Sequence, residues 1–139
     1  MAALSDYKEG TPLPEIRKNI TQEHINLYAK ASRDFNPIHL DAEFARTTPA
    51  GGTIAHGMLV LAYISEMMTA AFGESWLTGG KLNVRFRAPA RPGDTITASG
   101  QVRRVELGEG LRVVTCEVLC RNQNDEPVIT GDATVAVRT

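Results

Sequence analysis

The stretch that most constrains the fold of this chain is residues 55–72, AHGMLVLAYISEMMTAAF. It is apolar around most of a helical circumference, and its one charged residue is Glu66. Helices of this kind are normally buried on most sides. The longest uninterrupted apolar run, residues 58–64, is far too short to cross a bilayer. We therefore predict that residues 55–72 form the central helix of a globular core, and we expect no membrane association.

From residue 82 onward, apolar and polar residues alternate, which is typical of strands with one covered face. Turn-forming pairs such as Pro92-Gly93 and Asn124-Asp125 separate the alternating segments. Such short connections predict antiparallel neighbours. The apolar stripes comprise Leu82, Val84, Phe86, Ile96, Ala98, Val102, Val114, Cys116, Val118, Cys120, Ala133, Val135 and Val137.

An antiparallel sheet with one apolar face needs a cover, and the helix at residues 55–72 is the element able to provide it. We therefore predict an α+β hot-dog fold, in which a curved antiparallel sheet wraps around a long central helix. The length of 139 residues suits a single domain, residues 1–139. One such sheet leaves an edge strand and apolar surface unprotected, so we expect a homodimer or a higher homo-oligomer.

The first part of the chain is expected to be mostly helical. Residues 1–20 should be extended and loop-like, because their prolines prevent a regular helix. Thr21 is placed to cap a helix that ends near Ser32, and Asp41 to cap a short helix that ends near Arg46.

The charge and the cysteine content argue against a nucleic-acid-binding protein and a disulfide-bonded secreted protein. The net charge of -1 gives no strong attraction to nucleic acid or to an anionic membrane. The segment MAALSDYKEG lacks the features of a signal peptide. Cys116 and Cys120 lie four residues apart on one predicted strand, which suits neither a zinc pair nor a disulfide. We expect core thiols and a cytoplasmic protein.

The segment ASRDFNPIHLD, residues 31–41, mixes an acid and an imidazole with apolar residues. Pro37 forces a turn that can fold Asp34 and His39 back toward each other. A carboxylate and an imidazole can share acid and base work near neutral pH. The alternatives are a solvated helix cap for Asp34 and a half-buried structural role for His39. Asn36 is a candidate substrate contact or a partner for the backbone of the turn.

A second candidate lies where the central helix begins. The first amides of a helix have no internal partner, and Gly57 has no side chain to keep a ligand oxygen away from its N–H. The helix dipole favours negative charge there, so Gly57 suits an enolate-like oxygen or, alternatively, close packing of helix on sheet. Ser65 lies two turns later and could steady a catalytic side chain or bond back to a carbonyl. His56 receives no catalytic role and is expected to pack or lie on the surface.

The segment YAKASRDFNPIHLD, followed seventeen residues after His39 by AHGML, resembles the MaoC-like (R)-specific enoyl-CoA hydratase family of the hot-dog superfold. In that family the first segment is approximately an aromatic residue, two or three residues, and then Ser-Gly-Asp-x-Asn-Pro-x-His. FRAPARPGDTI, residues 86–96, is similar to the family's strand and Pro-Gly-Asp turn. One departure is Arg33, which replaces the usual glycine and would cost about 1 kcal/mol in a left-handed backbone.

By position, the resemblance implies a catalytic pair of Asp34 and His39, a carbonyl-binding amide at Gly57 and a supporting serine at Ser65. It implies that water adds to a trans-2-enoyl thioester to give an (R)-3-hydroxyacyl product, or the reverse dehydration, in fatty acid metabolism. The thioester would be carried by coenzyme A or by acyl-carrier protein. No metal and no cofactor is expected, since coenzyme A is part of the substrate. Which of the two catalytic residues gives and which takes the proton stays open.

Further substrate contacts are expected around this centre. Met68 is a candidate wall residue for the acyl chain, or ordinary core. The resemblance implies a site at a dimer interface, where Arg85, Arg87 or Arg91 of a partner could meet the coenzyme A phosphates. The alternative is that these arginines are solvated, as is routine on exposed strand faces.

Two other functions are kept open. An acyl-CoA thioesterase with this fold would need a carboxylate on the central helix, for which Glu66 is the candidate. The other is a non-catalytic acyl-thioester-binding subunit of a heteromeric dehydratase, to which Arg33 in place of the family glycine gives some weight.

Overall fold

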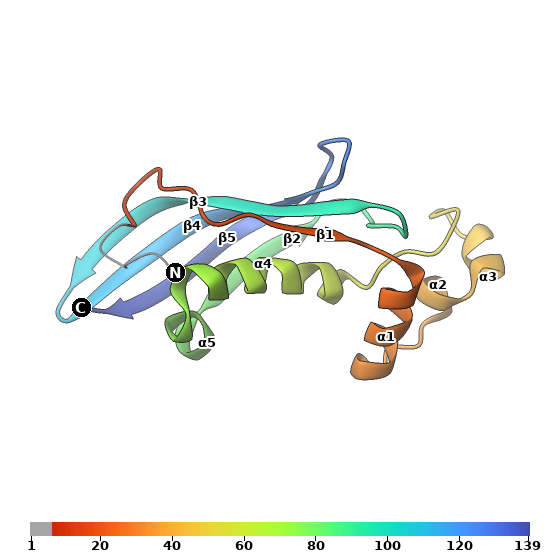
Figure 1. Cartoon of the computed structure of the whole chain (residues 1–139), viewed down its shortest axis with the longest axis horizontal. Coiled ribbons are helices and arrows are strands. Elements are labelled where there is room, and N and C mark those ends of the chain that lie inside the picture. Colours follow the sequence, from red (N-terminus) through yellow and green to blue (C-terminus); the bar gives the residue numbers. More distant parts are fainter. Residues whose placement is uncertain (1–6) are drawn as a thin grey trace.

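The computed structural model describes residues 7–139 and separates a helical first part from a strand-rich second part, as predicted (Figure 1). The elements in chain order are β1 (Ile16–Asn19), α1 (Gln22–Ser32), α2 (Pro37–Leu40), α3 (Ala42–Arg46), α4 (Gly57–Phe72), α5 (Glu74–Gly79), β2 (Lys81–Phe86), β3 (Thr95–Gly108), β4 (Leu111–Arg121) and β5 (Pro127–Arg138).

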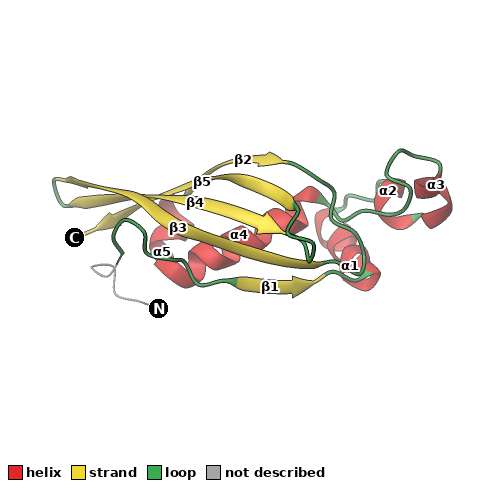
Figure 2. Cartoon of the chain, turned by 90° about the horizontal axis from the view of Figure 1, so that it is seen from above, coloured by secondary structure: helices red, strands yellow, loops and turns green. Residues whose placement is uncertain are grey.

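The five strands form one antiparallel sheet in the order β1-β3-β4-β5-β2. The long helix α4 runs along one face of this sheet in both views (Figures 1 and 2). This is the predicted curved sheet around a central helix. Strands β1 and β2 are the two edges.

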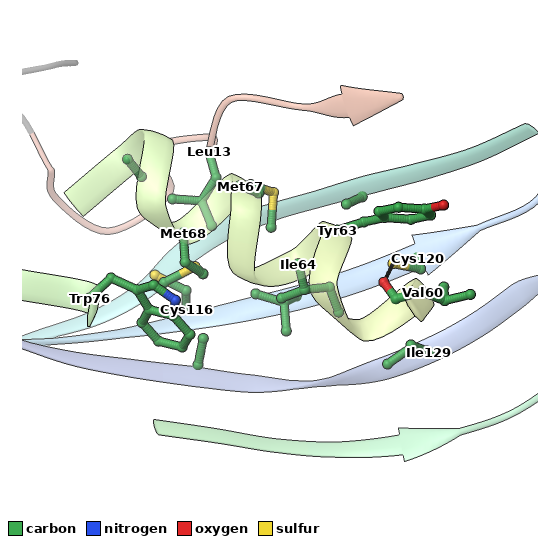
Figure 3. Packing of buried hydrophobic residues seen from close by; sticks show 14 of the residues in the cluster. Leu13, Val60, Tyr63, Ile64, Met67, Met68, Trp76, Cys116, Cys120 and Ile129 are labelled. Atoms are coloured by element: carbon green, nitrogen blue, oxygen red, sulfur yellow. Dashed lines mark hydrogen bonds between the residues drawn. The ribbon is translucent and has the colours of Figure 1, made fainter. Parts of the chain in front are cut away.

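The core lies between α4 and the sheet (Figure 3). Ile64, Met67 and Met68 on α4 are fully buried there. The structure therefore supports the alternative of Met68 as a core residue, and its role as a wall of the substrate pocket stays a prediction. Cys116 and Cys120 are buried free thiols, as predicted, and burial raises the pKa of each to about 12.

Three elements were not predicted. One is the single-turn helix α2, where a turn was expected. The two others are β1 and α5. Strand β1 lies within the segment expected to be extended and loop-like, and it pairs with β3 at the edge of the sheet. Helix α5 follows Gly73, whose φ of 58° ends α4, and it brings the indole of Trp76 into the core. Both elements are too short to give a periodic pattern that stands out from a loop.

Helix α1 lies at the end of the sheet where α4 begins, and α2 and α3 extend beyond that end (Figures 1 and 2). The predicted caps of α1 and α3 are confirmed. Thr21 Oγ1 accepts from His24 N at 3.0 Å, and Asp41 Oδ1 accepts from two amides at 3.1 Å. Within residues 7–139, no helix has the length and apolar character needed to cross a membrane.

Candidate active site

The turn after α1 sets the position of the first candidate residue. Arg33 ends the helix with φ 61° and ψ 25°, so the position where glycine was expected does have a left-handed backbone. Asp34 follows, and its Oδ1 accepts from Asn36 N at 3.2 Å. The Asp34 side chain is exposed in the single chain.

Pro37 opens the one-turn helix α2, which carries the second candidate. Asn36 caps this helix, because its Oδ1 accepts from Ile38 N at 3.1 Å. The structure therefore supports the backbone role of Asn36, and its role as a substrate contact stays a prediction. His39 is nine-tenths buried, and its Nδ1 lies 2.8 Å from Ile54 O. A carbonyl only accepts, so Nδ1 carries the proton and Nε2 is left with a lone pair in the neutral ring.

The turn at Pro37 brings Asp34 and His39 together, as the sequence predicts. A carboxylate oxygen of Asp34 and one ring nitrogen each from His39 and His56 all lie within 4.8 Å of one another. A carboxylate oxygen and an imidazole nitrogen this close together can both contact one water molecule.

His56, for which the sequence indicated no catalytic role, is the third member of this cluster. Its ring stacks on that of His39, with centroids 3.8 Å apart and planes at 23°. The Nε2 atom of His56 lies 3.0 Å from the Asp34 carbonyl oxygen. The ring of Tyr28 packs against the His56 ring, with centroids 4.8 Å apart. The position of His56 directly before Gly57 was the one sequence feature that placed it near the site. Sequence spacing cannot reveal a ring stack between residues seventeen apart.

A metal does not fit this cluster well, although three ligand types meet there. An imidazole binds a metal through a lone pair that lies in the ring plane, and two stacked rings direct those lone pairs side by side rather than toward one point. His39 Nδ1 and His56 Nε2 are also held by backbone carbonyls.

Gly57 is the first residue of α4, and within residues 7–139 its N–H has no hydrogen-bond partner. It lines a mostly apolar groove of about 360 Å³ together with Val60, Phe86 and Arg87. A Cβ built on Gly57 would lie 2.9 Å from Phe86 Cε1, so a side chain at this position would require the exposed Phe86 ring to move. An unpaired amide beside an apolar groove is suited to hold the oxygen of an acyl group.

The other predicted site residues lie outside this cluster. Ser65 Oγ accepts from Trp76 Nε1 at 2.9 Å, so it is bound to α5 rather than to the Asp34–His39 pair. Arg87 lines the groove and its Nε donates to Thr130 Oγ1 at 2.9 Å, whereas Arg85 is exposed on β2.

Comparison with known proteins decides the family. A family model described as the MaoC like domain matches residues 6–124. The chain belongs to the MaoC-like family. This confirms the predicted resemblance.

Two curated relatives and one solved structure are representative of the MaoC-like matches. The (R)-specific enoyl-CoA hydratase of Rhodospirillum rubrum is 35% identical over 96% of this chain and 90% of that protein. The mitochondrial 3-hydroxyacyl-[acyl-carrier-protein] dehydratase of Arabidopsis thaliana is 33% identical over 96% and 80%. The (R)-hydratase from A. caviae involved in PHA biosynthesis superposes with a TM-score of 0.79 at 27% identity, covering 94% of this chain and 96% of that one. The predicted hot-dog fold is confirmed.

Proposed function

We propose that this chain is a hydro-lyase that adds water to trans-2-enoyl thioesters to give (R)-3-hydroxyacyl products, or runs the reverse dehydration. The observation that carries the proposal is the meeting of Asp34 and His39 with His56, the residue directly before the unpaired Gly57 amide. The names of the hydratase and dehydratase relatives support the same reaction.

In the proposed reaction, His39 is the base. Its Nδ1–H is held by the Ile54 carbonyl, so Nε2 has the lone pair that accepts a proton from water. As the water oxygen bonds to Cβ, the electrons of the double bond move toward the thioester carbonyl, whose oxygen becomes enolate-like. The proton on Nε2 then passes to Cα, so that H and OH have been added and the neutral imidazole is restored.

Asp34 would orient the attacking water, and Gly57 would stabilise the enolate oxygen. The Asp34 carboxylate accepts a hydrogen bond from the second O–H of the water, and this bond orients a lone pair of the water oxygen toward Cβ. The Gly57 N–H donates to the enolate oxygen at the positive end of α4. Both roles need no cofactor, and none is proposed beyond the coenzyme A or carrier-protein thioester itself.

The substrate is proposed to enter along the groove lined by Gly57, Val60 and Phe86. Arg87 lies on the same groove and is better placed than Arg85 to meet the phosphates of coenzyme A. A homodimer, a single domain over residues 1–139 and a cytoplasmic location stay predictions.

The two alternative functions have less support. A thioesterase would need Glu66 free to activate water, but its carboxylate pairs with Lys18 Nζ at 3.1 Å. The non-catalytic alternative depended on Arg33, and the left-handed backbone there forms with arginine in place.

The experiment is a spectrophotometric assay of the purified protein with crotonyl-CoA, followed by chiral analysis of the product. We expect the enoyl absorbance to fall and (R)-3-hydroxybutyryl-CoA to form. Release of free thiol would instead identify a thioesterase, and binding without turnover would identify a non-catalytic subunit.

A further inference from the structure

We propose that His56 is a positioning residue, which holds the backbone of Asp34 and the ring of His39 so that the pair faces one water. The inference rests on the proposed function and adds to it a residue that has no contact with the reacting atoms in the mechanism above.

The first link runs from His56 to the turn that carries Asp34. The carbonyl of Asp34 can only accept, so His56 Nε2 carries a proton and donates it across 3.0 Å. The remaining hydrogen bonds of this turn are local: Ser32 Oγ accepts from Asp34 N, and Asp34 Oδ1 accepts from Asn36 N. The His56 contact therefore ties an exposed turn with a left-handed residue to the start of α4.

The second link runs from His56 to His39. The two rings are stacked, with centroids 3.8 Å apart. The hydrogen bond from His39 Nδ1 to Ile54 O fixes the rotation of the His39 ring within this stack. Rotation of the His39 ring would break both contacts. Tyr28 packs against His56 in turn, so the stack is backed by α1.

A simple packing role does not account for an imidazole at this position. His56 is 2% exposed, and its Nδ1 is buried with no hydrogen-bond partner among the described residues. An unpaired buried acceptor costs stability that an apolar side chain of similar size would avoid. An apolar side chain could not make the hydrogen bond that His56 Nε2–H donates to the Asp34 carbonyl oxygen.

The test compares two amides of different reach. In His56→Gln the amide nitrogen can occupy the position of Nε2 and still donate to Asp34 O, whereas in His56→Asn it stops near the position of Nδ1. Misplacement of catalytic groups by about 1 Å can cost about 10²-fold in rate. We expect kcat with crotonyl-CoA to be about fivefold below wild type in His56→Gln and about 10²-fold below it in His56→Asn, with KM within twofold in both.

The split between the two variants decides the outcome. A kcat at least tenfold higher for His56→Gln than for His56→Asn supports positioning through the Asp34 carbonyl. A smaller ratio, or a change confined to KM, overturns it. Thermal unfolding checks that both variants fold; if His56→Asn does not, His56→Phe replaces it as the variant that lacks a donor.

A measurement without substrate separates this inference from the proposed function. The chain has three histidines, so ¹⁵N spectra of their rings can be assigned by single substitutions. We expect the Nε2–H tautomer for His56 and the Nδ1–H tautomer for His39. The opposite tautomer at His56 would overturn the inference even in an active enzyme, and the expected tautomers in a protein that does not hydrate crotonyl-CoA would leave the arrangement intact while the proposed function fails.

Discussion

At the residue scale, the proposed chemistry needs a backbone amide at Gly57 that a substrate oxygen can approach. We predict that Gly57→Ala lowers kcat with crotonyl-CoA by about 10²-fold, because the added methyl group obstructs the amide and removal of one such donor typically costs 10²- to 10³-fold. The new Cβ would lie 2.9 Å from Phe86 Cε1. Phe86 is 54% exposed and its ring can move, so we expect only a small change in Tm.

The control for Gly57→Ala is the double variant Gly57→Ala/Phe86→Leu, which removes the contact with the aromatic ring. Activity should stay low in this variant if the amide is what matters. Recovery of wild-type kcat would mean that the single variant acts through displacement of Phe86, and would argue against oxyanion binding at Gly57.

Sequence reasoning at this scale succeeded where the chemistry follows from one turn. Asp34 and His39 flank Pro37, and local backbone rules operate over a few residues, so their meeting could be predicted. The left-handed position at Arg33 was indicated only by the family resemblance, in which glycine is usual there. The role of His56 could not be predicted, because a ring stack depends on how α2 packs against the start of α4. For the same reason the contact of Ser65 with Trp76 was not foreseen.

At the element scale, Ser65 joins α4 to α5 through the indole of Trp76. We predict that Ser65→Ala lowers the free energy of unfolding by about 1–3 kcal/mol, because it leaves a buried N–H without its partner. We expect kcat to stay within twofold of wild type. Trp76 is the one tryptophan of the chain, so its fluorescence reports the change directly. A large loss of kcat at unchanged stability would restore the catalytic role that the family resemblance implies for Ser65.

Strand β4 makes stability depend on pH through its two buried thiols. Burial raises the pKa of Cys116 and Cys120 from 9.0 to about 12. The native state therefore keeps these protons while the unfolded state loses them, so their contribution is complete below pH 9 and is lost as the pH rises toward 12. The loss is at most about 1.4 kcal/mol per thiol for each pH unit.

The matched variant for this pH dependence is Cys116→Ala/Cys120→Ala. The pKa of Tyr63 is raised mainly by burial and secondarily by the charge of Cys120, so the variant removes that second contribution as well. Denaturant unfolding from pH 8 to pH 11 should show the wild type losing stability more steeply than the variant above pH 9. If the free energy of unfolding fell equally with pH in both proteins, burial would not raise the pKa of the two thiols.

Two of the elements that sequence reasoning missed share a physical cause. The long helix α4 and the strands β2 to β5 have enough residues for a periodic pattern to appear. Strand β1 has four residues and α5 has six, and both are held by tertiary contacts: β1 by pairing with β3, and α5 by burial of Trp76.

At the scale of the whole molecule, the sheet leaves β2 as an edge, and Phe86 at the end of that edge is more than half exposed. We predict that a second copy covers this surface, because unpaired edges and exposed aromatic side chains favour association. Sedimentation should give twice the chain mass of 15.1 kDa. Phe86→Glu should shift the protein toward monomer.

The control for the dimer is Leu107→Glu, at an apolar position that is more exposed than Phe86 and lies near the β3–β4 hairpin, away from β2. This variant should remain dimeric. A wild-type protein that sediments as a monomer at micromolar concentration would contradict the dimer.

The most direct test of the account is the hydration of crotonyl-CoA by wild type, Asp34→Asn and His39→Gln. Asp34→Asn removes the negative charge that orients the water, and His39→Gln removes the imidazole that takes its proton, so we expect each to lower kcat by about 10²- to 10⁴-fold with the fold unchanged. Wild-type kcat in both variants would contradict the assignment of Asp34 and His39 as the catalytic pair.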